Sequence, residues 1–296
     1  MKLGTVKQNN EEIAAILAGN KLIPLREFNE QFDYKWEETV FDLLQSGKFE
    51  QLKTWYDDEG KELLVKEAGV AGEAELAPLY RNPRKIWGIG LNYTNSKEEK
   101  AEAPYTDPVS FMKPDTSLIG EGDQINIPQG STQTTAEAEL AIIIGKTCDH
   151  VEESEAMNYV AGFTTALDMT EASIHEANLR YLTRAKSFNT FFSFGSYLFT
   201  PDEFTSLEKI TVSTYQNGKM KHTNCIENMR YSLPYIVSFH SKVMTLLPGD
   251  VLLTGTPGAV VIHKGDKVEC MISGMPRLAN EVADVVSRCD TPSSSR

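Results

Sequence analysis

The sequence predicts an α+β fold rich in β-structure, preceded by a small α/β domain. From Lys85 onward, short apolar runs alternate with Gly, Pro and Asp, which is typical of many short strands joined by turns. Before that point, strand and helix patterns predict a small α/β domain over residues 1–80. Together these observations favour a β-rich sandwich, roll or barrel over a doubly wound parallel sheet.

The leading domain contains a predicted hairpin and two predicted helices. Apolar runs flank Gly19-Asn20, and this pattern indicates two strands around a tight turn. Two later stretches carry apolar side chains at helical spacing, and a segment with several Gly and Pro residues predicts a linker. The predicted strands are residues 13–17 and 22–25, the helices residues 36–45 and 49–66, and the linker residues 68–84.

Residues 81–289 are expected to form the larger, β-rich domain. One amphipathic helix is predicted within residues 229–243, with Pro234 in its first turn. His240 then lies on the face of this helix and is not expected to be catalytic. The Pro- and Ser-rich residues 290–296 are expected to be a disordered tail. The predicted strands are residues 85–90, 108–112, 138–144, 159–168, 193–199, 209–215, 250–254 and 267–272.

The amino-acid composition limits the kinds of molecule that the protein is expected to bind. A net charge of −13, from 29 basic and 42 acidic residues, argues against nucleic acid or an anionic membrane, although small anionic substrates remain possible. The four cysteines show no Cys-x-x-Cys spacing, so we expect reduced thiols and neither a zinc site nor a disulfide framework. There is no apolar stretch typical of a secretory signal or a membrane span, so a cytoplasmic protein is expected.

Three acidic residues stand at the ends of apolar runs. Glu137 and Glu139 are two residues apart, so their side chains share one face of a predicted strand, and Asp168 closes the next run. Three carboxylates brought together without a counter-charge would repel one another. Because hard divalent cations prefer oxygen ligands, the pattern predicts a site for Mg²⁺ or Mn²⁺.

Several short motifs follow one another along the second part of the chain. They are Gly90-Leu91-Asn92-Tyr93, Phe111-Met112-Lys113-Pro114, Glu137-Ala138-Glu139-Leu140 with Ile144-Gly145-Lys146, Tyr159-Val160-Ala161-Gly162, Lys186-Ser187-Phe188, and Pro248-Gly249-Asp250 through Thr254-Gly255-Thr256-Pro257. No single motif is decisive, but their order is specific. In this order the chain resembles the fumarylacetoacetate hydrolase family, from about residue 84 to about residue 285.

The resemblance implies a mixed β roll, a homodimer and a site that binds small 2-oxo acids. By the same resemblance, Glu137, Glu139 and Asp168 would hold Mg²⁺ or Mn²⁺, and Lys186 would point at the substrate oxygens. The other residues that the resemblance implies to be substrate-binding are Asn92, Tyr93, Gly255 and Thr256.

Two departures from the family pattern affect the expected chemistry. Ser96 stands where hydrolytic members have a histidine, although the glutamate that follows it is kept as Glu99. A hydroxyl is a poor proton acceptor near neutral pH, so water activation by the usual pair is in doubt. Ala172 stands where an arginine often binds the substrate carboxylate. Arg180 or Arg184 could replace that arginine, and His175 could serve as a base, if residues 170–184 fold over the site as a lid.

These observations predict a metal-dependent enzyme acting on small 2-oxo acids through an enolate. Carbon–carbon bond cleavage, by decarboxylation or by hydrolysis, is placed first. The alternatives are an isomerase or tautomerase of unsaturated 2-oxo diacids, with Glu99 moving a proton, and a non-catalytic metal-binding relative.

Overall fold

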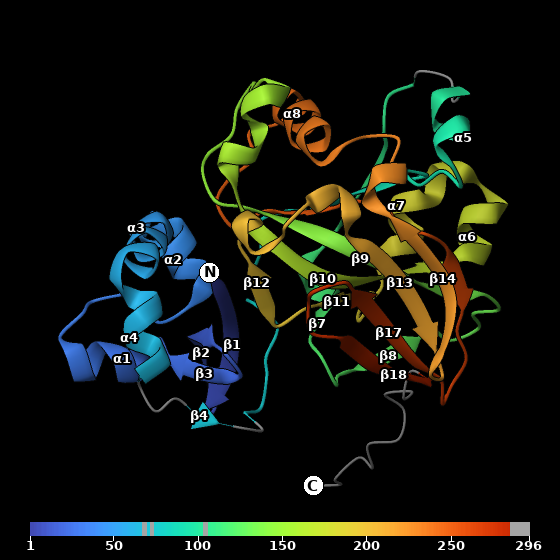
Figure 1. Cartoon of the computed structure of the whole chain (residues 1–296). Coiled ribbons are helices and arrows are strands. Elements are labelled where there is room, and N and C mark those ends of the chain that lie inside the picture. Colours follow the sequence, from blue (N-terminus) through green and yellow to red (C-terminus); the bar gives the residue numbers. More distant parts are fainter. Residues whose placement is uncertain (67–69, 72–73, 103–105, 285–296) are drawn as a thin grey trace, which may run out of the picture.

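A computed structural model describes residues 1–66, 70–71, 74–102 and 106–284 (Figure 1). The predicted tail, Cys289 and part of the predicted linker lie outside these residues. Cys148, Cys225 and Cys270 are free thiols, as the sequence predicts. No helix in the described ranges is both long enough and apolar enough to cross a membrane.

The larger of two β-sheets contains both the predicted hairpin and most of the later strands. In spatial order it consists of β4 (Val70–Ala71), β3 (Lys21–Pro24), β2 (Glu11–Ala18), β1 (Lys2–Gln8), β12 (Tyr197–Phe199), β10 (Val160–Glu171), β9 (Thr134–Ile144), β15 (Val251–Leu253), β5 (Ile86–Gly90) and β6 (Val109–Lys113). Beside this path, β11 (Phe192–Phe194) pairs with β10 and with β7 (Leu118–Ile119), and β16 (Ala259–Val261) pairs with β9.

A second sheet packs on one face of β9 and β10. Its strands are β14 (Lys219–Cys225), β13 (Thr211–Gln216), β17 (Lys267–Ile272), β18 (Leu278–Asp284) and β8 (Gln124–Ile127). Leu140 and Ile142 of β9 share a hydrophobic core with Val268 and Ile272 of β17. The β-rich α+β fold predicted from the sequence is confirmed.

The helices cover the edges and ends of these sheets. In α8 the hydroxyl of Ser232 accepts a hydrogen bond from the Tyr235 N–H, and Pro234 lies in the first turn, as predicted.

The predicted helix over residues 49–66 is divided by a π-helical turn, Tyr56–Gly60. A Cβ on Gly60 would lie 2.5 Å from the Trp55 ring, so this turn needs glycine. The helices are α1 (Leu25–Phe32), α2 (Val40–Gln45), α3 (Lys48–Trp55), α4 (Lys61–Lys66), α5 (Lys97–Glu102), α6 (Ala172–Ala177), α7 (Leu182–Lys186) and α8 (Leu233–Val243), and the 3-10 turns are Asp115–Ser117, Glu153–Tyr159, Leu179–Tyr181, Pro201–Glu203, Leu207–Lys209 and Ile226–Asn228.

The N-terminal segment is joined to the rest through β1, a strand that the sequence reasoning missed. It pairs with β12, so one sheet continues across both parts, and the boundary expected near residue 80 does not coincide with the edge of a sheet. Helices α1–α4 gather beside β1–β3 (Figure 1).

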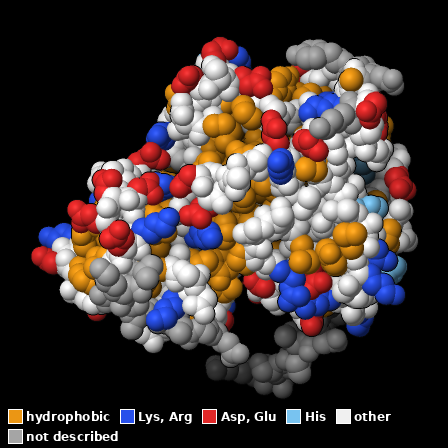
Figure 2. Space-filling view, in the orientation of Figure 1, with side chains coloured by type: hydrophobic (Ala, Val, Ile, Leu, Met, Phe, Trp, Pro, Cys, Tyr) orange, Lys and Arg blue, Asp and Glu red, His pale blue; other side chains and the backbone are white. Residues whose placement is uncertain are grey.

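Hydrophobic side chains run through the middle of the face shown in Figure 2, with acidic and basic side chains intermixed around them.

Alternation along β9 sets the position of the acidic residues. Leu140, Ile142 and Ile144 belong to the core beneath the second sheet, whereas Ala141 and Ile143 belong to the core on the opposite face. Glu137 and Glu139 have the same parity as Ala141 and Ile143. The two carboxylates therefore project from the face that the second sheet leaves uncovered.

The close packing of β10 against β12 at Gly162 can be tested by substitution. A Cβ there would lie 2.4 Å from the carbonyl oxygen of Phe199, which is backbone and cannot rotate away. We expect Gly162→Ala to lower the free energy of unfolding by about 1–3 kcal/mol, seen as a lower thermal midpoint. Gly90→Ala, another strand glycine but with open space, is the control and should change it by less than about 0.5 kcal/mol. Equal effects of the two substitutions would contradict this account.

Candidate active site

Three carboxylates meet where β9 and β10 run side by side. Glu137 and Glu139 come from β9 and Asp168 from β10, and the pairing register places Asp168 directly opposite Glu137. One carboxylate oxygen from each of the three lies within 4.8 Å of the others. Asp168 and Glu139 are buried and Glu137 is half-buried. The sequence prediction that these acids converge thus agrees with the geometry.

Lys186, the last residue of α7, inserts its ammonium group among these acids. Its Nζ donates hydrogen bonds to Glu137 Oε2 at 2.9 Å, to Thr170 Oγ1 at 2.8 Å and to Asp168 Oδ2. It also lies 4.3 Å from the centre of the Phe111 ring. Short helix α7 therefore returns the chain to the acids and fixes a positive charge beside them.

A second lysine, which the sequence analysis did not select, lies on the other side of Asp168. Lys113 ends β6, its side chain is fully buried, and its Nζ donates to Asp168 Oδ1 at 2.6 Å and to the Met169 carbonyl at 3.0 Å. The sequence did contain a signal for this residue, because Lys113 closes an apolar strand directly before a proline. Lysines are rarely buried unless they are paired, so a lysine at such a position indicates a buried ion pair.

Burial and charge shift the ionisation of these groups. Burial, followed by the charges of Asp168 and Glu137, raises the pKa of Glu139 well above its ordinary value. Burial alone would lower the pKa of Lys186, but Asp168, Glu137 and Glu139 outweigh it and hold that pKa above its ordinary value. Burial lowers the pKa of Lys113 to about 8, against the opposing effect of Asp168.

The donor set fits a hard divalent cation. With all three carboxylates ionised, the two ammonium groups leave one negative charge uncompensated in a largely buried place, in keeping with the raised pKa of Glu139. Glu139 Oε2 is held in position by the N–H of Gly255 at 2.6 Å, and the positive φ of 94° at Gly255 lets this backbone approach closely. Glu137, Glu139 and Asp168 would hold Mg²⁺ or Mn²⁺ through oxygen atoms, as those ions prefer.

Glu137, Glu139 and Lys186 line a pocket of about 460 Å³, whereas the fully buried Asp168 is not part of its lining. One side of the pocket is polar, and the other carries apolar side chains from β5, β6 and β16. The lining residues are Ile89, Gly90, Leu91, Val109, Phe111, Gln133, Thr135, Glu137, Glu139, Thr170, Ala172, His175, Glu176, Leu182, Lys186, Thr256, Ala259 and Val261.

Three residues predicted for catalysis or substrate binding line this pocket, namely Lys186, His175 and Thr256. His175 lies on α6, and its Nδ1 is buried without a hydrogen-bond partner among the described residues. The Thr256 hydroxyl accepts from the Gly258 N–H at 3.2 Å, which stabilises the turn after Gly255. The segment after Asp168 thus reaches the pocket through α6 and α7.

Two other predicted substrate-binding residues lie behind the pocket wall. Asn92 is fully buried and holds two loops together, since its amide donates to the carbonyls of Thr254 and Tyr231 and accepts from the Tyr231 N–H. Tyr93 has a buried hydroxyl without a partner in the described part of the chain. Burial and the charge of Glu139 raise the pKa of Tyr93 well above its ordinary value.

Glu99 and Arg184 are exposed and are not among the residues that line the pocket. The Glu99 carboxylate accepts hydrogen bonds from the backbone and side-chain nitrogens of Asn95, while its own N–H is capped by Ser96. The Arg184 guanidinium stacks 5.8 Å from the centre of the Tyr181 ring. In this arrangement the Ser96 hydroxyl caps the first turn of α5 through the Glu99 N–H.

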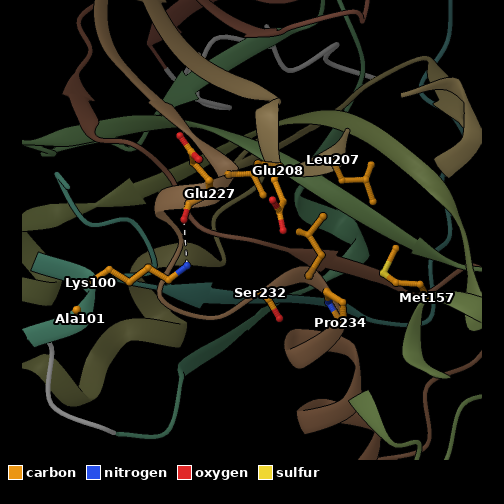
Figure 3. A pocket seen from close by; sticks show the side chains of 10 residues that line it. Lys100, Ala101, Met157, Leu207, Glu208, Glu227, Ser232 and Pro234 are labelled. Atoms are coloured by element: carbon orange, nitrogen blue, oxygen red, sulfur yellow. Dashed lines mark hydrogen bonds between the residues drawn. The ribbon is translucent and has the colours of Figure 1, made fainter. Parts of the chain in front are cut away.

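A larger cavity, of about 910 Å³, lies away from the acids (Figure 3). Lys100 of α5 extends from one side of it and donates to the carbonyl oxygen of Glu227 at 3.0 Å, with Met157 and Pro234 on the opposite side. None of the three clustered carboxylates lines this cavity. The chemistry that the acids allow therefore belongs to the smaller pocket.

Comparison with known proteins matches this arrangement to a family. The model of the fumarylacetoacetate (FAA) hydrolase C-terminal domain matches residues 85–283. The chain belongs to the fumarylacetoacetate hydrolase family. The match covers both sheets around β9 and β10, both lysines and all three acids. It begins after the N-terminal helices.

Relatives within this family carry different activities. The oxaloacetate tautomerase FAHD2, mitochondrial, of Arabidopsis thaliana is 35% identical over 213 residues, which are 69% of this chain and 92% of that protein. A solved fumarylacetoacetate hydrolase from Exiguobacterium antarcticum matches with a TM-score of 0.82 and 25% identity, over 96% of this chain and 99% of that one. Maleylpyruvate hydrolase from Sphingobium sp. SYK-6, solved with manganese(II) and pyruvate, has the same fold with a TM-score of 0.77 and 23% identity, over 96% and 99%.

Replacing Glu139 with glutamine should stabilise the metal-free protein near neutral pH. The amide keeps the shape of the side chain and can still accept from Gly255, but it removes a buried charge that Asp168 and Glu137 repel. Because the folded-state pKa of Glu139 is raised, its stabilising contribution is complete below about pH 4.5 and is lost as the pH rises through the folded-state pKa. With a chelator present, the gain in thermal midpoint should therefore be small in acid and grow with pH.

The same variant should no longer respond to divalent ions. Mn²⁺ or Mg²⁺ should raise the thermal midpoint of the unmodified protein, because a ligand that binds the folded state stabilises it, and this shift should vanish in Glu139→Gln. Glu176→Gln, which removes an exposed carboxylate at the rim, is the matched control and should retain the shift. A full metal shift in Glu139→Gln would contradict the assigned metal site.

Proposed function

We propose that the protein is a divalent-metal-dependent tautomerase that interconverts the keto and enol forms of a small 2-oxo acid. Tautomerisation moves a proton between C3 and the 2-oxo oxygen and consumes no water. The observation that carries the proposal is a pocket lined by Glu137, Glu139 and the ammonium group of Lys186, with Asp168 buried beside them, but without the Ser96–Glu99 segment in its lining. The sequence placed cleavage first, and this lining is the reason to propose tautomerisation ahead of it.

The floor of the pocket suits a developing negative charge on oxygen. A divalent ion held by Glu137, Glu139 and Asp168 would act as a Lewis acid toward the 2-oxo oxygen. Mn²⁺ and Mg²⁺ are both proposed, and the structural relative from Sphingobium carries manganese. The raised pKa of Lys186 keeps its ammonium group protonated, so Lys186 donates hydrogen bonds and does not serve as the base.

His175 is the proposed proton carrier. An imidazole can both accept and donate a proton, and His175 is the only histidine among the residues lining the described pocket. Its Nδ1 is buried without a partner among the described residues, so exchange of a proton between this nitrogen and C3 or a water would require the ring to turn toward the pocket. The turn of Gly255 and Thr256 would orient the carboxylate of the substrate at the floor.

Carbon–carbon cleavage is the second candidate. The structurally similar proteins from Exiguobacterium and Sphingobium are named as hydrolases, and His175 could activate a water instead of moving a proton at C3. Both reactions would start from the same charge-stabilised enolate form of the substrate. They differ in whether a carbon–carbon bond breaks afterwards.

One experiment tests both candidates. In heavy water, the Mn²⁺- or Mg²⁺-loaded protein should exchange the C3 hydrogens of oxaloacetate or an acylpyruvate for deuterium faster than the metal alone, as followed by nuclear magnetic resonance. A chelator should abolish the excess rate. Exchange without a new product supports the tautomerase, whereas pyruvate or carbon dioxide formed above the metal-only rate supports cleavage. If neither deuterium exchange nor a new product is observed with any of these acids, the proposal is refuted.

His175→Gln should lower the exchange rate about 10²-fold or more, because the pocket then lacks the imidazole proposed to carry the proton. The metal-induced shift in thermal midpoint should be unchanged, since His175 is not among the clustered ligands. His263→Gln, at an exposed histidine outside the pocket, is the control. A rate for His175→Gln within twofold of the unmodified rate would exclude His175 as the proton carrier.

A further inference from the structure

The ammonium group of Lys186 has all of its hydrogen-bond donors in use within the protein. A lysine ammonium group carries three N–H donors. Here Nζ donates to Glu137 Oε2 at 2.9 Å, to Thr170 Oγ1 at 2.8 Å and to Asp168 Oδ2. The Phe111 ring lies against the same ammonium group, with its centre 4.3 Å from Nζ. To donate to a substrate oxygen, Lys186 therefore has to release one of these acceptors first.

Two of the three acceptors belong to the carboxylates that are proposed to hold the divalent ion. Glu137 and Asp168 are members of the cluster of three acids, and each offers an oxygen to a common site. An ammonium group and a divalent ion at the same carboxylates repel each other, and burial strengthens this repulsion because it lowers the effective dielectric constant. The ion and the ammonium group of Lys186 are therefore competitors for the same two acids.

Lys113 is placed differently, although it binds the same aspartate. Its side chain is completely buried, it does not line the pocket, and its Nζ donates to Asp168 Oδ1 at 2.6 Å and to the Met169 carbonyl at 3.0 Å. Lys186, in contrast, is one of the residues that line the pocket, so its ammonium group has space into which it can turn. Of the two lysines that compensate the acids, Lys186 is the one that can move away from them.

Building on the proposed function, we infer that Lys186 is a tethered counter-cation that a divalent ion displaces from Glu137 and Asp168. The same exchange frees two N–H donors of Lys186 for the oxygens of the substrate, while Thr170 and the Phe111 ring keep the ammonium group at the pocket. Lys186 thus lowers the affinity of the site for the ion and raises its affinity for the substrate. The ion has to bind first.

The affinity for Mn²⁺, measured from the electron paramagnetic resonance signal of the free ion, tests this exchange. Lys186→Met should bind Mn²⁺ at least about tenfold more tightly than the unmodified protein, because the competing positive charge is gone. Lys186→Arg keeps the charge and should not bind more tightly. Lys146→Met removes a lysine that is half exposed and paired with Glu50, and this control should bind Mn²⁺ within about twofold of the unmodified protein. Equal or weaker Mn²⁺ binding by Lys186→Met would overturn the inference.

Oxalate, which resembles the enolate of pyruvate, should respond to the same substitution with the opposite sign. At saturating Mn²⁺, Lys186→Met should bind oxalate at least about tenfold more weakly in a calorimetric titration, because two charged hydrogen-bond donors are lost. A lysine with a merely structural role would weaken the binding of the ion and of oxalate together. Weaker binding of both ligands, or of neither, would overturn the inference.

A measurement on the unmodified protein does not depend on whether Lys186→Met folds. Buried and hydrogen-bonded ammonium protons exchange slowly with water, so the nitrogen signals of Lys113 and Lys186 should be visible by nuclear magnetic resonance, with Lys186→Arg used for assignment. Mg²⁺ should speed the exchange of the Lys186 protons and leave that of the Lys113 protons unchanged. Unchanged Lys186 exchange in protein that binds Mg²⁺ would overturn the inference, whereas failure to bind either Mg²⁺ or Mn²⁺ would refute the proposed function itself.

Discussion

The clustering of three carboxylates between two paired strands is the constraint on which the rest of this structure depends. Like charges at this separation repel, and burial strengthens the repulsion, so the fold must supply compensation. Lys113 and Lys186 hold Asp168 between them, and the Gly255 N–H holds Glu139. These two lysines and this loop come from distant parts of the chain, so the charge balance at the acids links much of the larger domain.

The compensation is incomplete, and this residual charge makes the site chemically useful. When all three carboxylates are ionised, the two ammonium groups leave one negative charge, which disfavours the metal-free state and favours a cation. The stability of the folded chain and its capacity to bind metal are therefore opposed at Glu139, as is common where a site is preorganised for charge. The protonated Lys186 is placed beside the same acids, where it can face the oxygens of a bound substrate.

Family membership leaves the reaction open, because similar proteins are named as tautomerases, hydrolases and isomerases. In this chain the Ser96 hydroxyl accepts a hydrogen bond from the Glu99 N–H in the first turn of α5, and neither residue lines the pocket beside Glu137 and Glu139. This arrangement directs the proposed function away from hydrolysis.

The sequence by itself determined the alternation that puts Glu137 and Glu139 on one face, the α8 helix with Pro234 in its first turn, and the β-rich class, because these follow from local periodicity. Only the tertiary structure decided that Lys113 joins the acids, that Asn92 is a structural residue behind the pocket, and that Glu99 and Arg184 lie outside its lining. The reason is physical: a short motif fixes which face a side chain takes, but contacts between β6, β9, β10 and α7 depend on the pairing of strands far apart in the chain.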